Sequence, residues 1–95
     1  MGGWVYIMTN KAFGTLYVGV TNDVVRRAWE HRNGIGSVFT SRYRLTRLVY
    51  FEQYERIEMA IQREKRFKHW PRQWKLNLIV ARNPRWEDLF ERLVQ

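Results

Sequence analysis

Hydrophobic and polar positions alternate in two short runs near the start of the chain. Residues 4–9 and 15–20 are rich in Val, Ile and Tyr, and the turn-forming stretch of residues 10–14 separates them. A period of two predicts that these runs are the strands of a β-hairpin. A third hydrophobic run, within residues 45–54, predicts a buried strand in the same sheet.

The hairpin predicts which side chains share a face. If Thr9 pairs with Gly14, antiparallel register places Tyr6 directly opposite Tyr17. The other face of both strands is then aliphatic, and we expect that face to be the core.

Hydrophobic spacing in the rest of the chain is helical. The Thr-Asn-Asp triplet at residues 21–23 supplies N-cap chemistry, and the Asn-Gly pair at residues 33–34 is typical of a helix end. Residues 35–44 are rich in hydroxyl and basic side chains, and we interpret them as a loop with one helical turn. Further helices are predicted over residues 56–69, 74–83 and 84–93, so the C-terminal part is expected to be wholly helical.

Composition indicates a single domain with a polyanionic partner. Residues 1–95 suffice for one compact domain, and 17 Lys and Arg against 9 Asp and Glu give a net charge of +8. The absence of cysteine excludes disulfides and thiolate catalysis. No apolar run approaches the roughly 18–20 residues of a membrane span. We therefore expect a cytoplasmic protein that binds nucleic acid, although charge can also serve solubility alone.

Arg27 and His31 lie four residues apart on the first predicted helix, so their side chains point the same way. A guanidinium stabilises the extra negative charge that develops during phosphodiester hydrolysis. An imidazole can orient or deprotonate water, or protonate an oxygen. In an arbitrary basic helix the same two residues are a surface cation and a half-buried side chain.

Glu64 follows Ala60 and Ile61 at helical spacing, which predicts that its carboxylate lies on the inward side of its helix. A buried carboxylate needs a partner, and one divalent ion is a candidate because Mg²⁺ binds through as few as one or two carboxylates. An ion pair with Lys68, four residues later, is the equally weighted alternative. Tyr6 and Tyr17 could hydrogen-bond the nucleophile or form an ordinary aromatic pair.

The ordered motifs resemble those of the GIY-YIG nuclease superfamily, especially its small stand-alone bacterial members. The quoted segments are Trp4-Val5-Tyr6, Tyr17-Val18-Gly19, Arg26-Arg27, His31, Arg63-Glu64-Lys65 and the stretch of residues 83–89. The resemblance extends from Trp4 to about Trp86. It implies an α/β sandwich, with a three-stranded sheet flanked by helices, and one-metal hydrolysis of DNA.

The resemblance also implies a role for each matching residue. Tyr6 and Tyr17 would line the site, Arg27 would stabilise the transition state, and Glu64 would bind one Mg²⁺ or Mn²⁺ ion. His31 matches a histidine near the nucleophile, and which tyrosine takes the proton is left open. Asn77 matches an asparagine near the metal in some members, or is an ordinary polar position.

The sequence departs from the family pattern at three positions. Trp4 replaces the first glycine and Val18 replaces isoleucine, and we expect these changes to alter packing only. Val20 stands where some repair members carry a lysine, so a cation that could assist there is missing.

Basic and aromatic residues alternate in the second half of the chain. Cations can bind phosphates while exposed rings stack on unpaired bases, although the tryptophans can equally belong to the core. The predicted nucleic-acid track comprises Arg42, Arg44, Arg47, Arg63, Arg66, Lys68, Arg72 and Lys75, interleaved with Tyr43, Phe67, Trp70 and Trp74.

Two functional classes follow from these observations. The first is a divalent-metal-dependent DNA endonuclease of repair or recombination, with weak selectivity for branched, flapped or single-stranded DNA or with an unknown recruiting protein. The second is a nucleic-acid-binding or adaptor module that keeps the scaffold without turnover. RNA processing is a third, weaker interpretation.

Overall fold

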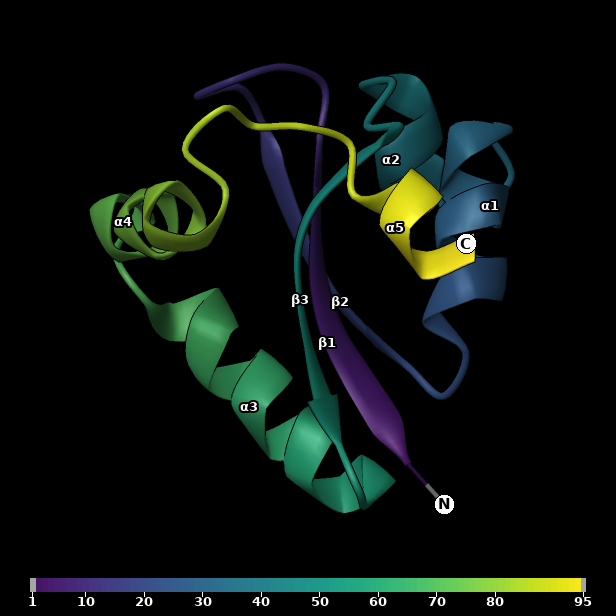
Figure 1. The fold of residues 1–95 in the computed structure, drawn as a ribbon, viewed down its shortest axis with the longest axis vertical. Coiled ribbons are helices and arrows are strands. Elements are labelled where there is room, and N and C mark those ends of the chain that lie inside the picture. Colours follow the sequence, from purple (N-terminus) through teal and green to yellow (C-terminus); the bar gives the residue numbers. More distant parts are fainter. Residues whose placement is uncertain (1, 95) are drawn as a thin grey trace.

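One antiparallel sheet forms the centre of the protein. The structure, a computed structural model, describes residues 2–94. Its strands are β1 (Gly3–Thr9), β2 (Leu16–Thr21) and β3 (Arg47–Tyr54), in the order β2-β1-β3. The predicted α/β class and three-stranded sheet are confirmed. Because β1 is central, β2 is an edge strand of the sheet (Figure 1).

The predicted register of the hairpin is wrong by two residues. Thr9 pairs with Leu16 and not with Gly14. The turn is longer because the Asn10 side-chain oxygen accepts a hydrogen bond from the Thr15 backbone N–H, while Thr9 Oγ1 donates to the Thr15 carbonyl. These bonds hold Thr15 in the loop. A shift of two residues nevertheless leaves every side chain on its predicted face.

Two groups of helices cover opposite faces of the sheet. Figure 1 shows α1 (Val24–Arg32), α2 (Val38–Arg42) and α5 (Phe90–Val94) on one side, with α3 (Ile57–His69) and α4 (Arg72–Arg82) on the other. Asp23 caps α1 by accepting from the Arg26 N–H, and Ser37 caps α2 by accepting from the Thr40 N–H. Over residues 2–94, no helix has the length and apolar character that a membrane span requires.

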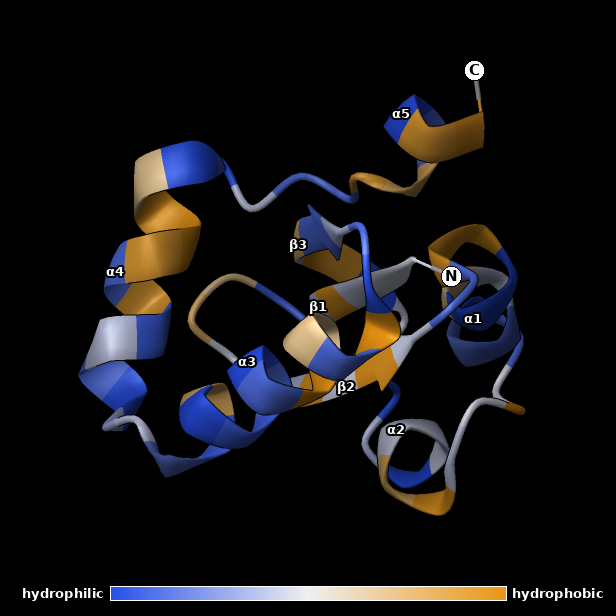
Figure 2. Ribbon diagram, turned by 90° about the horizontal axis from the view of Figure 1, so that it is seen from below, coloured by the Kyte–Doolittle hydropathy of each residue, from blue (hydrophilic) through white to orange (hydrophobic). Residues whose placement is uncertain are grey.

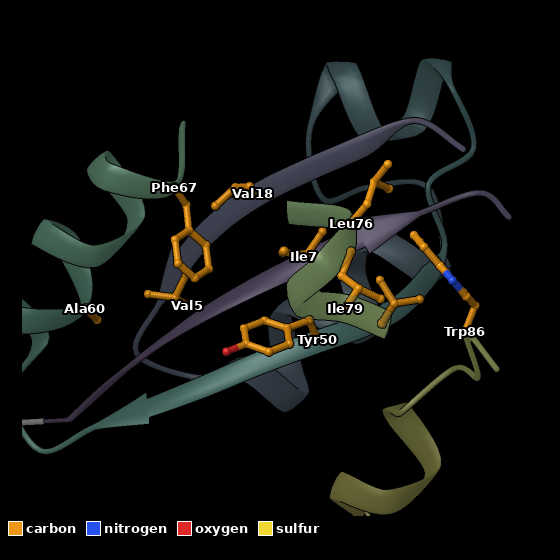
Figure 3. Packing of buried hydrophobic residues seen from close by; sticks show 10 residues of the cluster. Val5, Ile7, Val18, Tyr50, Ala60, Phe67, Leu76, Ile79 and Trp86 are labelled. Carbon is orange, nitrogen blue, oxygen red and sulfur yellow. The ribbon is translucent and has the colours of Figure 1, made fainter. Parts of the chain in front are cut away.

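The predicted core on the aliphatic face of the sheet is confirmed, and the tyrosine-bearing face is buried as well. The aliphatic side packs on α3 and α4, as Figure 3 shows for Val5, Ile7, Val18, Tyr50, Ala60, Phe67, Leu76, Ile79 and Trp86. The tyrosine-bearing side packs on α1 and the C-terminal segment, through Tyr6, Met8, Val24, Ala28, Leu45, Leu48 and Leu89. A buried tyrosine face must satisfy its hydroxyl groups internally.

The segment that links α4 to α5 is not helical, so the prediction of a wholly helical C-terminal part is wrong. The Asn83 side chain donates to the carbonyls of Val49 and Glu87 and accepts from the Glu87 N–H. Asp88 accepts from the Leu48 N–H. These side-chain bonds replace the helical ladder and attach the segment to β3.

Candidate active site

The Tyr6 ring lies beneath a glycine of the neighbouring strand. Tyr6 is opposite Gly19 in the sheet and only 1% exposed. A Cβ at Gly19 would lie 2.8 Å from Tyr6 Cε1 and closer still to Cζ and the hydroxyl oxygen. The glycine is therefore required for space, because any side chain would displace the ring.

A chain of hydrogen bonds links Tyr6 to helix α2. The Tyr6 hydroxyl lies 2.9 Å from His31 Nε2, and His31 Nδ1 lies 2.9 Å from Thr40 Oγ1. Thr40 Oγ1 in turn lies 2.8 Å from Ser37 Oγ. A Cβ at Gly36 would lie 2.6 Å from His31 Cε1. The imidazole is thus fixed by hydrogen bonds at both nitrogens and by close backbone contact.

Burial keeps both rings of this pair uncharged at neutral pH. Burial, helped by the nearby Arg27 cation, lowers the pKa of His31 to about 4. Burial also raises the pKa of Tyr6 to about 12, against the opposing effect of a hydrogen bond with Arg27. His31 is therefore a neutral imidazole and a weak base, suited to hold the Tyr6 phenol by a hydrogen bond.

Tyr17 shares this cluster in spite of the shifted register. Its ring centroid lies 6.4 Å from that of Tyr6 and 5.6 Å from that of His31. Unlike Tyr6, Tyr17 is only partly buried. The two phenols therefore differ in access, and Tyr17 is the one that solvent can reach.

Arg27 extends from the cluster into an open cleft. Its Nη1 lies 3.0 Å from Glu30 Oε1, and its side chain is 33% exposed. Burial lowers the pKa of Arg27, but hydrogen bonds with Glu30 and Tyr6 raise it above its usual value, so the guanidinium stays charged. The cleft, of about 540 Å³, is lined by Thr21, Asn22, Asp23, Arg26, Arg27 and Glu30.

Glu64 lies on α3, which covers the opposite face of the sheet. Its side chain is 12% exposed and its Oε2 lies 2.7 Å from Lys68 Nζ, so the predicted ion pair is present. Ala60 and Phe67 are fully buried, whereas Ile61 is exposed. The inward side of α3 therefore runs through Ala60 and Phe67, and Glu64 borders it.

A groove at the sheet edge connects Lys68 with Tyr17. It measures about 290 Å³ and is lined by Leu16, Tyr17, Val18, Phe39, Lys68 and Lys75. Because β2 is an edge strand, residues from both faces of the sheet meet in this groove. The partner of Glu64 therefore lines the same groove as Tyr17, while Arg27 lines the separate cleft on α1.

The side chains near Glu64 fit a metal ion that binds the protein through a single carboxylate. Within the described residues 2–94, no group of three or more His, Cys, Asp or Glu side chains could enclose a metal. A single carboxylate beside a basic groove fits Mg²⁺ or Mn²⁺, which keep several waters and also bind substrate phosphate. Lys68, with its side chain 53% exposed, must then leave the carboxylate.

Arg63, predicted to bind nucleic acid, is engaged within the protein. Its Nε and Nη2 lie 3.1 and 3.2 Å from the two carboxylate oxygens of Glu52. Tyr50 and Tyr54 also donate their hydroxyls to Glu52. Burial alone would raise the pKa of Glu52. The hydrogen bonds from Arg63, Tyr50 and Tyr54 lower it by more, so the pKa of Glu52 is below its usual value. This network ties α3 to β3.

The other predicted nucleic-acid contacts are spread over the surface. Lys68 and Lys75 line the groove with Tyr17, and the Arg42 guanidinium lies 6.0 Å from the Tyr43 ring centroid. Arg44, which has a positive φ of 55°, is exposed at the end of α2. Arg72 Nη2 donates to the Phe13 and Gly14 carbonyls, and exposed Asn77 accepts from Gln73.

Sequence reasoning missed four residues of the site. Thr40 and Ser37 fix His31, Gly36 leaves room for its ring, and Glu30 binds Arg27. Ser37 is a residue type that favours helix N-caps, but nothing in the sequence shows that Thr40 also reaches a histidine. Glu30 could have been found from its spacing of three residues after Arg27.

Comparison with known proteins identifies the family. The family described as the GIY-YIG catalytic domain matches residues 2–77. A UPF0213 protein of Staphylococcus aureus is 42% identical over 79 residues, covering 83% of this chain and 95% of the relative. One from Staphylococcus saprophyticus is 38% identical over 76 residues, covering 80% and 92%. The solution NMR structure of a UPF0213 protein from Bacillus halodurans superposes with a TM-score of 0.58 at 32% identity, covering 93% of both chains.

Fold and site together define a small α/β protein of nuclease type, with a tyrosine, histidine and arginine cluster beside a basic groove. This chain belongs to the GIY-YIG family, as its motifs predicted. Its family is one of nucleases, and the substrate class is therefore nucleic acid.

Proposed function

We propose that this protein is a metal-dependent endonuclease that hydrolyses DNA phosphodiester bonds. The observation that carries the proposal is the cluster of Tyr6, His31, Tyr17 and Arg27, next to a groove lined by lysines. A role in DNA repair or recombination is part of the proposal and rests on the roles that the family resemblance implies.

Tyr17 is the phenol that contacts the attacking water in this mechanism. It lines the groove, whereas the Tyr6 hydroxyl is buried and already bonded to His31. Neutral His31 holds Tyr6 in place, with the Tyr6 hydroxyl 2.9 Å from its Nε2, and the Arg27 guanidinium lies near enough to the Tyr6 phenol to oppose the rise in its pKa. Tyr6 and His31 are therefore positioning residues for the guanidinium.

Arg27 and the lysines provide positive charge for the reaction. Arg27 is partly exposed and permanently charged, so it can bind the phosphate whose charge increases in the transition state. Glu64 is the residue that would hold the metal. Such an ion, when bound, polarises the phosphate and lowers the pKa of water.

Nicking of supercoiled DNA with Mg²⁺ or Mn²⁺ tests the proposal. Arg27→Ala and Glu64→Gln should each lower the rate about 100-fold or more, as expected when one electrostatic contact to the transition state is removed. Glu58→Gln is the matched control, since Glu58 is an exposed carboxylate on the same helix that pairs with Arg56. Equal nicking by all four proteins would refute the proposal.

The pair between Glu64 and Lys68 is the one observation that favours a non-catalytic module, because the carboxylate already has a cation. That alternative predicts DNA binding without nicking, whichever divalent ion is supplied. The same assay run on RNA addresses the third interpretation.

A further inference from the structure

Helix α2 presents aromatic rings to solvent beside the candidate active site. Phe39 is 43% exposed and Tyr43 is 47% exposed, although large aromatic side chains are usually well buried. Val38, on the same helix, is 86% exposed. Figure 2 shows the hydrophobic part of α2 on the side of the helix away from the sheet. This surface needs an explanation.

The exposed rings continue from Tyr17. The Tyr17 and Phe39 centroids are 6.1 Å apart with planes at 29°, and the Phe39 and Tyr43 centroids are 4.9 Å apart. Three rings therefore lead outward from the phenol that faces the groove. Tyr17 lines the groove, and Tyr43, at the other end of the series, is exposed to solvent.

The helix that carries the rings is held in a fixed position. Ser37 caps it, and Thr40 on the same helix bonds to His31. Because Thr40 contacts the buried histidine, the backbone of α2 is anchored next to the candidate active site. A ligand that contacts Phe39 is therefore positioned against Tyr17.

Positive charge surrounds the same rings. Lys68 and Lys75 line the groove together with Phe39, and the Arg42 guanidinium lies beside the Tyr43 ring. Rings between cations match a ligand with flat apolar surfaces and negative charges, which is the chemistry of a nucleic-acid strand. An apolar segment of a protein would gain little from these cations.

We propose that Phe39 and Tyr43 form a stacking site for unpaired bases, which positions single-stranded DNA with a phosphate in the Tyr17 groove. This inference rests on the proposed function and names its substrate class. Bases in a duplex are stacked on one another, so only unpaired ones expose a face to the rings. The site therefore selects strand state and not sequence.

An exposed tryptophan on α1 provides the comparison. Trp29 is 51% exposed and is not a residue of the predicted nucleic-acid track. It resembles Phe39 and Tyr43 in exposure but is not one of the three rings that lead outward from Tyr17. Trp29→Leu is therefore a matched control for the loss of an exposed ring.

Binding without metal tests the stacking site separately from cleavage. The Phe39→Leu/Tyr43→Leu double variant should bind a 20-nucleotide single strand about 10- to 100-fold more weakly in EDTA, since stacking contributes ~1–3 kcal/mol per base. Its affinity for a blunt-ended duplex without unpaired bases should not change. A 2-aminopurine base in the strand should be quenched by the wild type and by Trp29→Leu, but not by the double variant.

The outcomes separate the two proposals. Equal binding of single strands by wild type and double variant, or an equal loss for duplex, overturns the stacking site even if the protein nicks DNA. Selective loss for single strands supports it, whether or not nicking is seen. Melting curves confirm that the exposed substitutions leave the fold intact, and Lys75→Gln should reduce the salt dependence for both ligands.

Discussion

Gly19→Ala tests whether close packing against the Tyr6 ring holds the cluster of Tyr6, His31 and Tyr17 together. The added Cβ would lie 2.8 Å from Tyr6 Cε1, closer than real Cβ atoms approach other heavy atoms. Tyr6 is almost fully buried, so its ring has no free space to enter. Overpacking of this kind costs about 1–3 kcal/mol. A cost near 2 kcal/mol lowers the melting temperature by roughly 8–16 °C in a domain of this size.

The displaced ring should also lose its bond to His31, which is 2.9 Å long in the native structure. DNA nicking should therefore decrease about 10-fold or more beyond any loss of folded protein. In a Tyr6→Leu background the ring is gone, and Gly19→Ala should then cost much less stability, as a double-mutant cycle would measure.

Gly34→Ala is the matched control for this prediction. Gly34 has a φ of +74°, and a Cβ there has only Ser41 Oγ near it, at 3.8 Å. The substitution should cost about 1–2 kcal/mol through backbone strain alone and should leave nicking by the folded protein unchanged. If Gly19→Ala were as active as Gly34→Ala at equal stability, or if its cost were the same with and without the Tyr6 ring, the packing argument would be wrong.

Three further predictions concern charge. His31 takes up a proton below pH 6.5 in the unfolded protein, but only near pH 4 in the folded protein. The free energy of unfolding should therefore fall by up to about 3 kcal/mol as the pH decreases from 6.5 to 4. Urea titrations should show that His31→Gln lacks this decrease. Glu52→Gln should cost about 1–3 kcal/mol in the same assay, because it disrupts the internal network of Glu52 with Arg63, Tyr50 and Tyr54. The double variant Glu52→Gln/Arg63→Gln, which keeps the net charge, should leave DNA affinity unchanged; weaker DNA binding by the double variant would show that Arg63 contacts DNA. Lys68→Met should strengthen Mn²⁺ binding about two- to fivefold in calorimetry without DNA, because the ion no longer competes with a surface ion pair; unchanged affinity would show that Glu64 is not the metal ligand.

The order of the elements was predictable because local signals agree with the fold. The Asp23 cap and the positive φ at Gly34 lie at the two ends of the α1 region, where residue type alone predicts them. The hairpin register was not predictable, because it depends on Asn10 closing the turn with its side chain. The stretch after α4 was misread as helical, because Asn83 and Asp88 replace backbone bonds with contacts to β3 that are remote in sequence.

The site was predictable to the extent that its residues share one strand face or one helix face. Arg27 and His31 are four residues apart on α1, and Tyr6 and Tyr17 keep the same face under any even shift of register. The burial of Tyr6 was not predictable, since an alternating strand does not show that a second layer covers its other face. The bond from Thr40 to His31 also requires the fold, because residues 33–37 must bring α2 back against α1.

The position of β2 at the sheet edge explains how one site can use both faces. Tyr17 points to the face covered by α1, and α3 lies on the other, so side chains on the two helices could not meet across the middle of a sheet. At an edge strand only one backbone separates the two faces, and the groove that contains Tyr17 and Lys68 passes around it. The buried cluster is therefore set by folding, while Lys68, with its side chain 53% exposed, lies at the edge in the groove that the proposed mechanism assigns to the phosphate strand.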